Sequence, residues 1–102
     1  FWRVLFAIMN DNKQKIVYLD RDGVINKEVN YLYKIDEFEF IDGVFEACFY
    51  FIQKGYNIII ITNQSGIAKG IYKLEDYKIL TKWMIEQFNI KSIDILEDSK
   101  KL

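Results

Sequence analysis

Two aspartates, Asp20 and Asp22, close a short apolar stretch and are followed by Gly23. In an extended chain, residues i and i+2 point to the same face, so both carboxylates are expected in one crevice beyond the carboxyl end of a strand. Two close carboxylates repel unless a cation neutralises them, which suits a Mg²⁺ site or an acid/base pair. The spacing therefore favours phosphoryl-transfer chemistry, and a solvated acidic turn is the alternative.

Thr62 and Asn63 follow a second apolar run, over residues 56–61. Adjacent parallel strands lie about 5 Å apart, so these side chains are expected to share the crevice with the two carboxylates. A hydroxyl and an amide there can hold phosphoryl oxygens while Mg²⁺ offsets the charge. The backbone of residues 65–66 and the Lys69 ammonium could also face an anion. The alternative is an ordinary strand-to-helix turn beside a surface lysine, and the Walker A spacing is absent.

The apolar pattern predicts strands that alternate with helices. Continuous apolar runs are typical of buried parallel strands, and spacings of three and four residues are typical of amphipathic helices. The predicted order is a strand over 16–19, a helix from an Asp42 N-cap to a stop at Gly55, a strand over 56–61 covered on both faces, a helix over 74–88 and a strand over 92–96. This order predicts the α/β class, with a Rossmann-like parallel sheet and right-handed crossover helices.

The two remaining segments lack a regular pattern. Residues 26–40 are irregular and rich in Tyr, Glu and Asp, so we expect a long connection that folds over the crevice and selects the substrate. Residues 1–8 resemble a short signal segment without a basic leader or cleavage site, and Met9 resembles a natural start. We therefore predict that residues 1–15 form an N-terminal extension, non-native before Met9, and that the folded domain covers residues 16–102.

Composition excludes several classes of function. The 102 residues allow one domain, and 51% of them are apolar, which is enough for a packed core. A net charge of −1 disfavours nucleic acid and anionic membranes as partners, and no apolar run reaches the ~20 residues that span a bilayer. The chain has no histidine, and Cys48 is its single cysteine. Metal centres built from these residues are therefore not expected, and a reducing cytoplasm fits best.

Three spaced blocks carry a resemblance to a known family. They are DRDGVIN at residues 20–26, DEFEFIDG at 36–43 and IITNQSGIAKG at 60–70. Together they resemble the haloacid dehalogenase-like phosphatases, most of all the D-glycero-D-manno-heptose 1,7-bisphosphate phosphatases, with histidinol-phosphate phosphatases next. The similarity runs from about residue 16 to residue 88.

The resemblance implies a role for each matched position. Asp20 is then the nucleophile that forms an aspartyl-phosphate, Asp22 the general acid and base, and Thr62 the group that stabilises the transferring phosphoryl. Mg²⁺ is bound by the Asp20 carboxylate and the Asp22 backbone carbonyl. The implied substrate is a sugar bisphosphate, and the implied substrate-binding residues are Arg21, Glu28, Val29, Asn30, Tyr31, Asn63, Gln64, Ser65 and Lys69.

The chain also departs from the family pattern. Lys69 stands where the family usually has Arg, which keeps the charge but loses the bidentate fork. The family's Zn²⁺-binding Cys and His loop, its Arg-Lys pair and its later acidic Mg²⁺ ligand have no counterpart here. We therefore expect an amino-terminal half, incomplete at the C-terminal side of the sheet, with reduced or no activity alone. The alternatives are a histidinol-phosphate phosphatase, or a non-catalytic phosphate- and Mg²⁺-binding half that needs a second chain.

Overall fold

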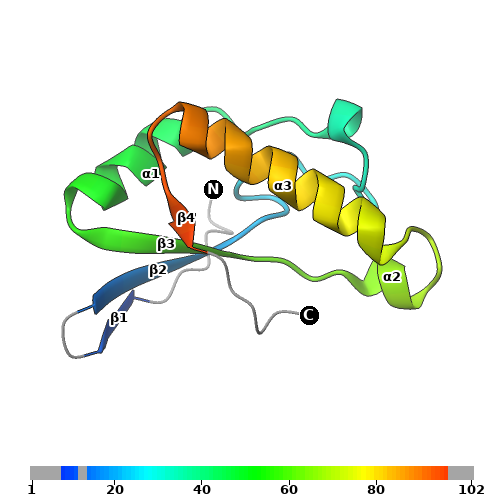
Figure 1. Cartoon of the computed structure of the whole chain (residues 1–102), viewed down its shortest axis with the longest axis horizontal. Coiled ribbons are helices and arrows are strands. Elements are labelled where there is room, and N and C mark those ends of the chain that lie inside the picture. The colour runs from blue at the N-terminus through cyan, green and yellow to red at the C-terminus, as the bar shows by residue number, and fades with distance from the viewer. Residues whose placement is uncertain (1–7, 12–13, 97–102) are drawn as a thin grey trace.

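The computed structural model describes residues 8–11 and 14–96 (Figure 1). Strands and helices alternate along most of this part of the chain. The elements are β1 (Ile8–Asp11), β2 (Gln14–Asp20), the 3-10 helix η1 (Ile35–Glu37), α1 (Val44–Gln53), β3 (Tyr56–Ile61), α2 (Ser65–Ala68), α3 (Leu74–Ile90) and β4 (Ile95–Leu96).

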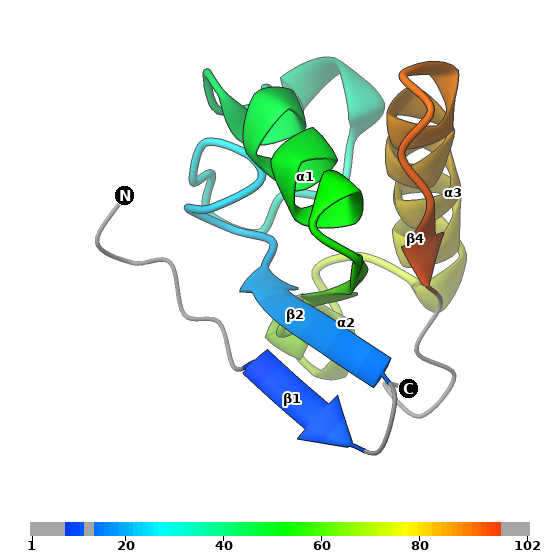
Figure 2. The ribbon, with the colours of Figure 1, turned by 90° about the vertical axis from the view of Figure 1, so that its left-hand side faces the viewer.

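The strands form one sheet in the order β1-β2-β3-β4. β2, β3 and β4 are parallel, and the register pairs Val17 with Ile58 and Asp20 with Ile61. α1 connects β2 to β3 and α3 connects β3 to β4, and both helices lie on the same side of the sheet (Figures 1 and 2). The predicted Rossmann-like α/β fold, with a parallel sheet and crossover helices, is confirmed.

β1 is a difference from the sequence-based boundary. Residues 8–11 pair antiparallel with β2, and β2 itself begins at Gln14, so part of the segment that we assigned to an extension belongs to the sheet. A four-residue strand is too short to show a periodic pattern, and it is held by backbone pairing to the edge of β2. Residues 1–7 of the predicted extension lie outside the described residues.

The core fills the space between the sheet and the two long helices. Val17 of β2, Ile58 of β3, Cys48 of α1 and Phe88 of α3 are all fully buried. Tyr18 and Ile59, which alternate with them on the opposite face of the sheet, are only partly buried. The prediction that β3 is covered on both faces was therefore wrong for the described part of the chain, in which helices cover one face.

The helix ends depend on glycines with positive φ. Gly43, with φ of 87°, caps α1 and no side chain caps it, so the predicted Asp42 cap was wrong. The predicted stop of this helix at Gly55 is confirmed. Gly55 follows the C-cap residue Lys54, also has φ of 87°, and donates its N–H to the Ile52 carbonyl at 3.0 Å. α3 runs two residues beyond its predicted end, and β4 is shorter than predicted.

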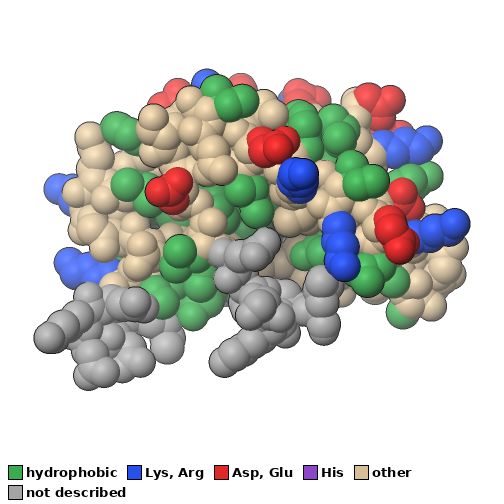
Figure 3. All heavy atoms as spheres, in the orientation of Figure 1, with side chains coloured by type: hydrophobic (Ala, Val, Ile, Leu, Met, Phe, Trp, Pro, Cys, Tyr) green, Lys and Arg blue, Asp and Glu red, His purple; other side chains and the backbone are tan. Residues whose placement is uncertain are grey.

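Several apolar side chains on α1 and α3 are exposed. Phe49 and Tyr50 on α1 and Ile79 and Ile90 on α3 are exposed. Figure 3 shows apolar side chains interspersed with charged ones on this face. In residues 8–11 and 14–96, no helix combines the length and apolar character that crossing a bilayer requires.

The burial of Cys48 predicts how the folded chain reacts with thiol reagents. The side chain has no exposed surface, and burial raises the pKa of its thiol to about 12. Because the thiolate is the reactive form, iodoacetamide at pH 8 should modify Cys48 only when the chain unfolds. Mass spectrometry in increasing urea should give a labelling curve that follows the unfolding transition. Labelling in buffer at the rate of a free thiol would contradict this core.

Candidate active site

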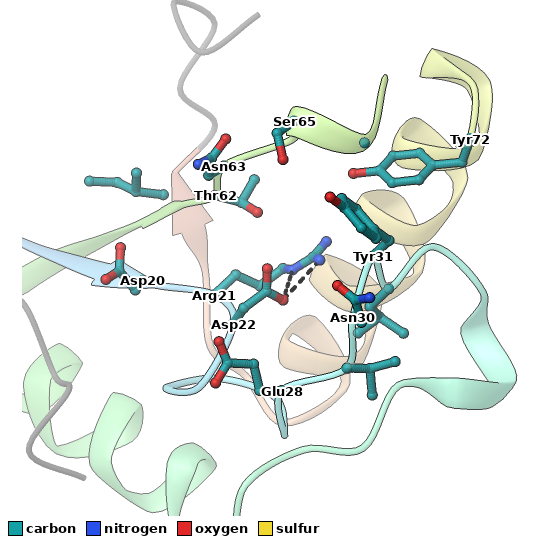
Figure 4. Close-up of a pocket in the computed structure, with 14 residues that line it drawn as sticks. Asp20, Arg21, Asp22, Glu28, Asn30, Tyr31, Thr62, Asn63, Ser65 and Tyr72 are labelled. Atoms are coloured by element: carbon teal, nitrogen blue, oxygen red, sulfur yellow. Dashed lines mark hydrogen bonds and ion pairs between the residues drawn. The ribbon is translucent and has the colours of Figure 1, made fainter. Parts of the chain in front are cut away.

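A polar pocket lies at the carboxyl end of β2 and β3. Its volume is about 460 Å³. The turn after β2, the connection that follows it and the segment after β3 supply its walls (Figure 4). The residues that line it are Asp20, Arg21, Asp22, Glu28, Val29, Asn30, Tyr31, Leu32, Ile61, Thr62, Asn63, Ser65, Gly66 and Tyr72. Ten of the twelve sequence-predicted site residues are among them.

Strand register brings the catalytic candidates together. Asp20 is paired with Ile61, so Thr62 begins the segment beyond the neighbouring strand. The Arg21 N–H continues the ladder by donating to the Ile61 carbonyl at 2.9 Å. Asp20, Asp22 and Thr62 therefore border one pocket, as the two apolar runs and their polar ends predicted.

The turn after β2 is built around the Arg21 carbonyl. This oxygen accepts hydrogen bonds from the N–H groups of Val24 (3.2 Å), Ile25 (2.8 Å) and Asn26 (3.2 Å). Gly23 adopts φ of 86°, which a side chain would disfavour. The tight turn fixes the backbone of Asp22 and holds its side chain at the pocket.

One oxygen of Asp22 takes three hydrogen bonds. The Arg21 Nε and Nη2 atoms donate to Asp22 Oδ1 at 3.1 and 3.0 Å, and Asn26 Nδ2 donates to it at 3.2 Å. Arg21 is 3% exposed, so this is a nearly buried guanidinium that is paired with a carboxylate, as burial of a charge requires. The other oxygen, Oδ2, takes none of these bonds.

Asn26 belongs to the site, although we did not predict it as a functional residue. It is fully buried, and its Nδ2 also donates to the Lys27 carbonyl at 2.9 Å. Its Oδ1 has no hydrogen-bond partner among the described residues. A polar side chain directly after the apolar pair at 24–25 was the available sequence signal.

The connection after the turn borders the pocket, as predicted. Residues 28–32 line one wall. The exposed Lys27 Nζ pairs with Glu39 Oε2 at 2.7 Å, and this carboxylate raises the pKa of the Lys27 ammonium. The Lys27 N–H also donates to the Glu39 carbonyl at 2.8 Å. The two ends of the connection are thereby held side by side.

Gln64 and Lys69 are the two predicted substrate residues that do not line the pocket. Gln64 Nε2 donates to the Oγ1 atom of Thr62, which does line the pocket. Lys69 Nζ donates to the Tyr31 hydroxyl at 2.7 Å and lies 5.3 Å from the centre of that ring. Both residues therefore act on residues that line the pocket, which spacing alone did not reveal.

Tyr72 is a site residue that sequence reasoning missed. It is 7% exposed and comes from the segment before α3, seven residues after Ser65, so only the tertiary fold brings it to the pocket. Burial raises the pKa of its hydroxyl, with a smaller opposing effect of the Arg21 charge, so the group is protonated at neutral pH. Figure 4 shows its hydroxyl directed toward the same space as those of Tyr31, Thr62 and Ser65.

Comparisons with known proteins agree with this geometry. No protein-family model matches the chain. Over 83 residues it is 51% identical to the D-glycero-alpha-D-manno-heptose-1,7-bisphosphate 7-phosphatase of Campylobacter jejuni, covering 81% of this chain and 48% of that protein. The protein of the same name from Photorhabdus laumondii is 49% identical over 89 residues, with coverages of 87% and 49%.

A solved structure shares the fold. The D,D-heptose 1,7-bisphosphate phosphatase from B. bronchiseptica, in complex with magnesium and phosphate, has a TM-score of 0.71 and 26% sequence identity. The match covers 78% of this chain and 45% of that one. The chain spans about half the length of the curated relatives it matches.

Together, fold and sequence show that the matched part of this chain is homologous to about half of these phosphatases, which confirms the resemblance to the haloacid dehalogenase-like phosphatases carried by the three sequence blocks. Within that class, the relatives that it matches are heptose 1,7-bisphosphate 7-phosphatases.

The environment of Asn26 predicts a pH-dependent loss of stability in Asn26→Asp. Burial and the nearby Asp22 carboxylate favour the neutral form of the introduced carboxyl, so its pKa should be higher in the folded than in the unfolded chain. The penalty should therefore be smallest below about pH 4 and grow as pH rises, reaching about 3 kcal/mol at pH 8. Urea unfolding at several pH values measures it.

Asn26→Ala is the matched control. It removes the same hydrogen bonds without adding a charge, so its own free-energy loss should change little with pH. Equal pH profiles for the two variants would show that position 26 is not close to a carboxylate inside a buried turn.

Proposed function

We propose that this chain carries the phosphoryl-transfer centre of a phosphomonoester hydrolase that acts on a sugar bisphosphate, of the D,D-heptose 1,7-bisphosphate 7-phosphatase type. The observation that carries the proposal is the meeting of Asp20 and Asp22, after β2, with Thr62, after β3, in one polar pocket. Two homologues that are named for this activity, with 51% and 49% sequence identity, support the proposal.

The proposed reaction begins at Asp20. An oxygen of its carboxylate attacks phosphorus, the bond from phosphorus to the sugar oxygen breaks, and an aspartyl-phosphate forms. Water then attacks this phosphorus, which releases inorganic phosphate and restores the carboxylate. Within the described residues, Asp20 makes no hydrogen bond or ion pair through its side chain, so the group is available as a nucleophile.

Asp22 is proposed to move the protons. It gives one to the leaving sugar oxygen and later takes one from the attacking water. The Arg21 and Asn26 bonds all end on Oδ1, which fixes the carboxyl plane and leaves Oδ2 for this exchange. Thr62 and Ser65 offer hydroxyl donors to the phosphoryl oxygens from the opposite wall.

The charges of the pocket fit a divalent cation. Its lining includes the carboxyl groups of Asp20 and Asp22 and a single guanidinium, that of Arg21, which is already paired with Asp22. A phosphate dianion would meet net repulsion there unless a cation entered with it. We propose that the Asp20 carboxylate and the Asp22 backbone carbonyl hold Mg²⁺, which neutralises phosphoryl charge when bound. The similar B. bronchiseptica phosphatase is complexed with magnesium and phosphate, which supports a divalent cation next to the phosphoryl group.

Three carboxylates, thiols or imidazoles that could together hold a metal are not found in residues 8–11 and 14–96. Mg²⁺ commonly uses one or two carboxylates with water and substrate phosphate, so the donor set is adequate for it. It is not adequate for Zn²⁺, because the chain has no histidine and Cys48 is buried in the core. No zinc-dependent step is proposed.

Residues 28–32 are proposed to form the wall that selects the substrate. The two curated relatives described above are both named for the alpha anomer of the heptose bisphosphate. A second candidate is a phosphate- and Mg²⁺-binding half that becomes active with a complementary polypeptide. In that case the same carboxylate-bearing pocket would bind phosphate together with Mg²⁺. The free thiol fits a cytoplasmic site of action.

Asp20→Asn tests the nucleophile. The swap preserves shape and removes the attacking oxygen's charge, so phosphate release from heptose 1,7-bisphosphate should fall at least a thousandfold while the urea midpoint changes little. Release is measured for both anomers and for histidinol phosphate, which separates the two enzyme readings. Asp36→Asn, in the exposed η1, is the matched control and should keep full activity. Normal turnover by Asp20→Asn would refute the assignment.

Removal of Mg²⁺ tests the charge argument and also covers the non-catalytic candidate. Orthophosphate binding, followed by ³¹P NMR or calorimetry, should require Mg²⁺ and weaken at least tenfold after EDTA treatment, because the carboxylates would otherwise repel the anion. Ca²⁺-free buffer with added Mg²⁺ should restore binding. Equal phosphate affinity with and without Mg²⁺ would show that the pocket does not balance its charge through a cation.

A further inference from the structure

A line of three polar side chains leads from Tyr72 to the pocket wall. The Tyr72 hydroxyl donates to Gln64 Oε1, and Gln64 Nε2 donates to Thr62 Oγ1. Tyr72 and Thr62 line the pocket, whereas Gln64 does not. The family resemblance implied that Gln64 binds substrate, whereas nothing in the sequence singled out Tyr72.

The direction of these hydrogen bonds has a chemical reason. A phenol is a stronger acid than an aliphatic hydroxyl, so the amide oxygen is better placed toward Tyr72 and the amide nitrogen toward Thr62. Because an amide nitrogen only donates, Thr62 Oγ1 must accept from it. The hydroxyl hydrogen of Thr62 is then left to be donated elsewhere, and phosphoryl oxygens only accept.

The surroundings hold the Tyr72 ring in place. Its ring stacks on Tyr33, with centroids 5.3 Å apart and planes at 15°. A Cβ added at Gly66 would lie 2.3 Å from the Tyr72 ring, so only glycine allows the ring to lie against α2. The hydroxyl of a ring fixed in this way has little freedom, which suits a group that orients its neighbours.

We infer that Tyr72 is a positioning residue for phosphoryl transfer: acting through the Gln64 amide, it directs the Thr62 hydroxyl as a hydrogen-bond donor into the pocket. This inference rests on the proposed function for its purpose, but the hydrogen-bonded line itself is independent of it. The groups that face Tyr72 with charge are Arg21 and Asp22, and Tyr77 is the other titratable neighbour.

The first test needs no activity. The Tyr72 Cζ resonance is followed by ¹³C NMR as pH rises, in the wild-type chain and two variants. Gln64→Leu removes an acceptor that stabilises the protonated phenol, so Tyr72 should titrate at lower pH than in the wild type. Gln64→Glu adds a charged acceptor and should raise the titration. Unchanged titration in both variants would overturn the inference, whatever the chain catalyses.

The second test uses orthophosphate with Mg²⁺ and, for turnover, heptose 1,7-bisphosphate. Tyr72→Phe should lower phosphate affinity and kcat about fivefold, with kcat falling more than KM changes, because the donor matters most in the transition state. Gly66→Ala, which displaces the ring, should act in the same direction. In a Thr62→Val background the Tyr72→Phe effect should vanish, whereas in Thr62→Ser it should persist.

Gln64→Glu should weaken phosphate binding further, because a carboxylate accepts from both Tyr72 and Thr62 and pulls the Thr62 hydrogen away from the pocket. Asn63→Asp is the matched control for charge, since it adds a carboxylate at the same edge without touching this line. Equal effects of the two variants, or additive effects of Tyr72→Phe and Thr62→Val, would overturn the positioning role alone. A wild-type chain that neither binds phosphate nor releases it would overturn the proposed function, and the tyrosine titration would still decide the hydrogen-bonded line.

Discussion

The whole site depends on the register between β2 and β3. Asp20 reaches the pocket opposite Thr62 only because Val17 pairs with Ile58 and Asp20 with Ile61. A slip of one residue would turn every side chain of one strand to the other face. Val17 and Ile58 are both fully buried against the helices, so such a slip would expose core residues and carry Asp20 away from Thr62. The hydrophobic core and the geometry of the pocket are thus fixed by the same pairing.

The turn after β2 adds a second constraint, which is electrostatic. Arg21 is nearly buried, and its charge is tolerated because Asp22 lies within hydrogen-bond distance. The Asn26 side chain donates to Asp22 Oδ1, the oxygen that Arg21 also binds, and the Asn26 backbone N–H donates to the Arg21 carbonyl. Removing the Asp22 carboxylate would leave the nearly buried Arg21 guanidinium without its ion-pair partner. The turn therefore determines both the stability of this region and the orientation of the proposed acid/base group.

The sequence predicted correctly the elements that have a regular hydrophobic pattern. The continuous apolar runs gave β2 and β3, and the spacing of Tyr77, Leu80, Met84 and Phe88 gave α3, because burial on one side imposes that spacing. β1 was beyond reach, since backbone pairing of four residues needs no side-chain pattern. Tyr72 and the contact of Gln64 with Thr62 were missed for a related reason: both depend on how the segment after β3 folds back over Gly66.

The pocket is formed by two kinds of backbone, the ends of strands and an irregular connection. Asp20, Thr62 and their neighbours stand at strand ends, where ladder hydrogen bonds hold the backbone, while residues 28–32 form a wall outside the sheet. That wall is fastened by the Lys27–Glu39 pair at its base and by Lys69, which binds Tyr31 from α2's C-cap position. Residues of the wall can change without disturbing the strand ends, so substrate selection can vary while the proposed phosphoryl chemistry stays the same. Lys69 contacts this wall and does not line the pocket, so the positive charge among the lining residues is the Arg21 guanidinium.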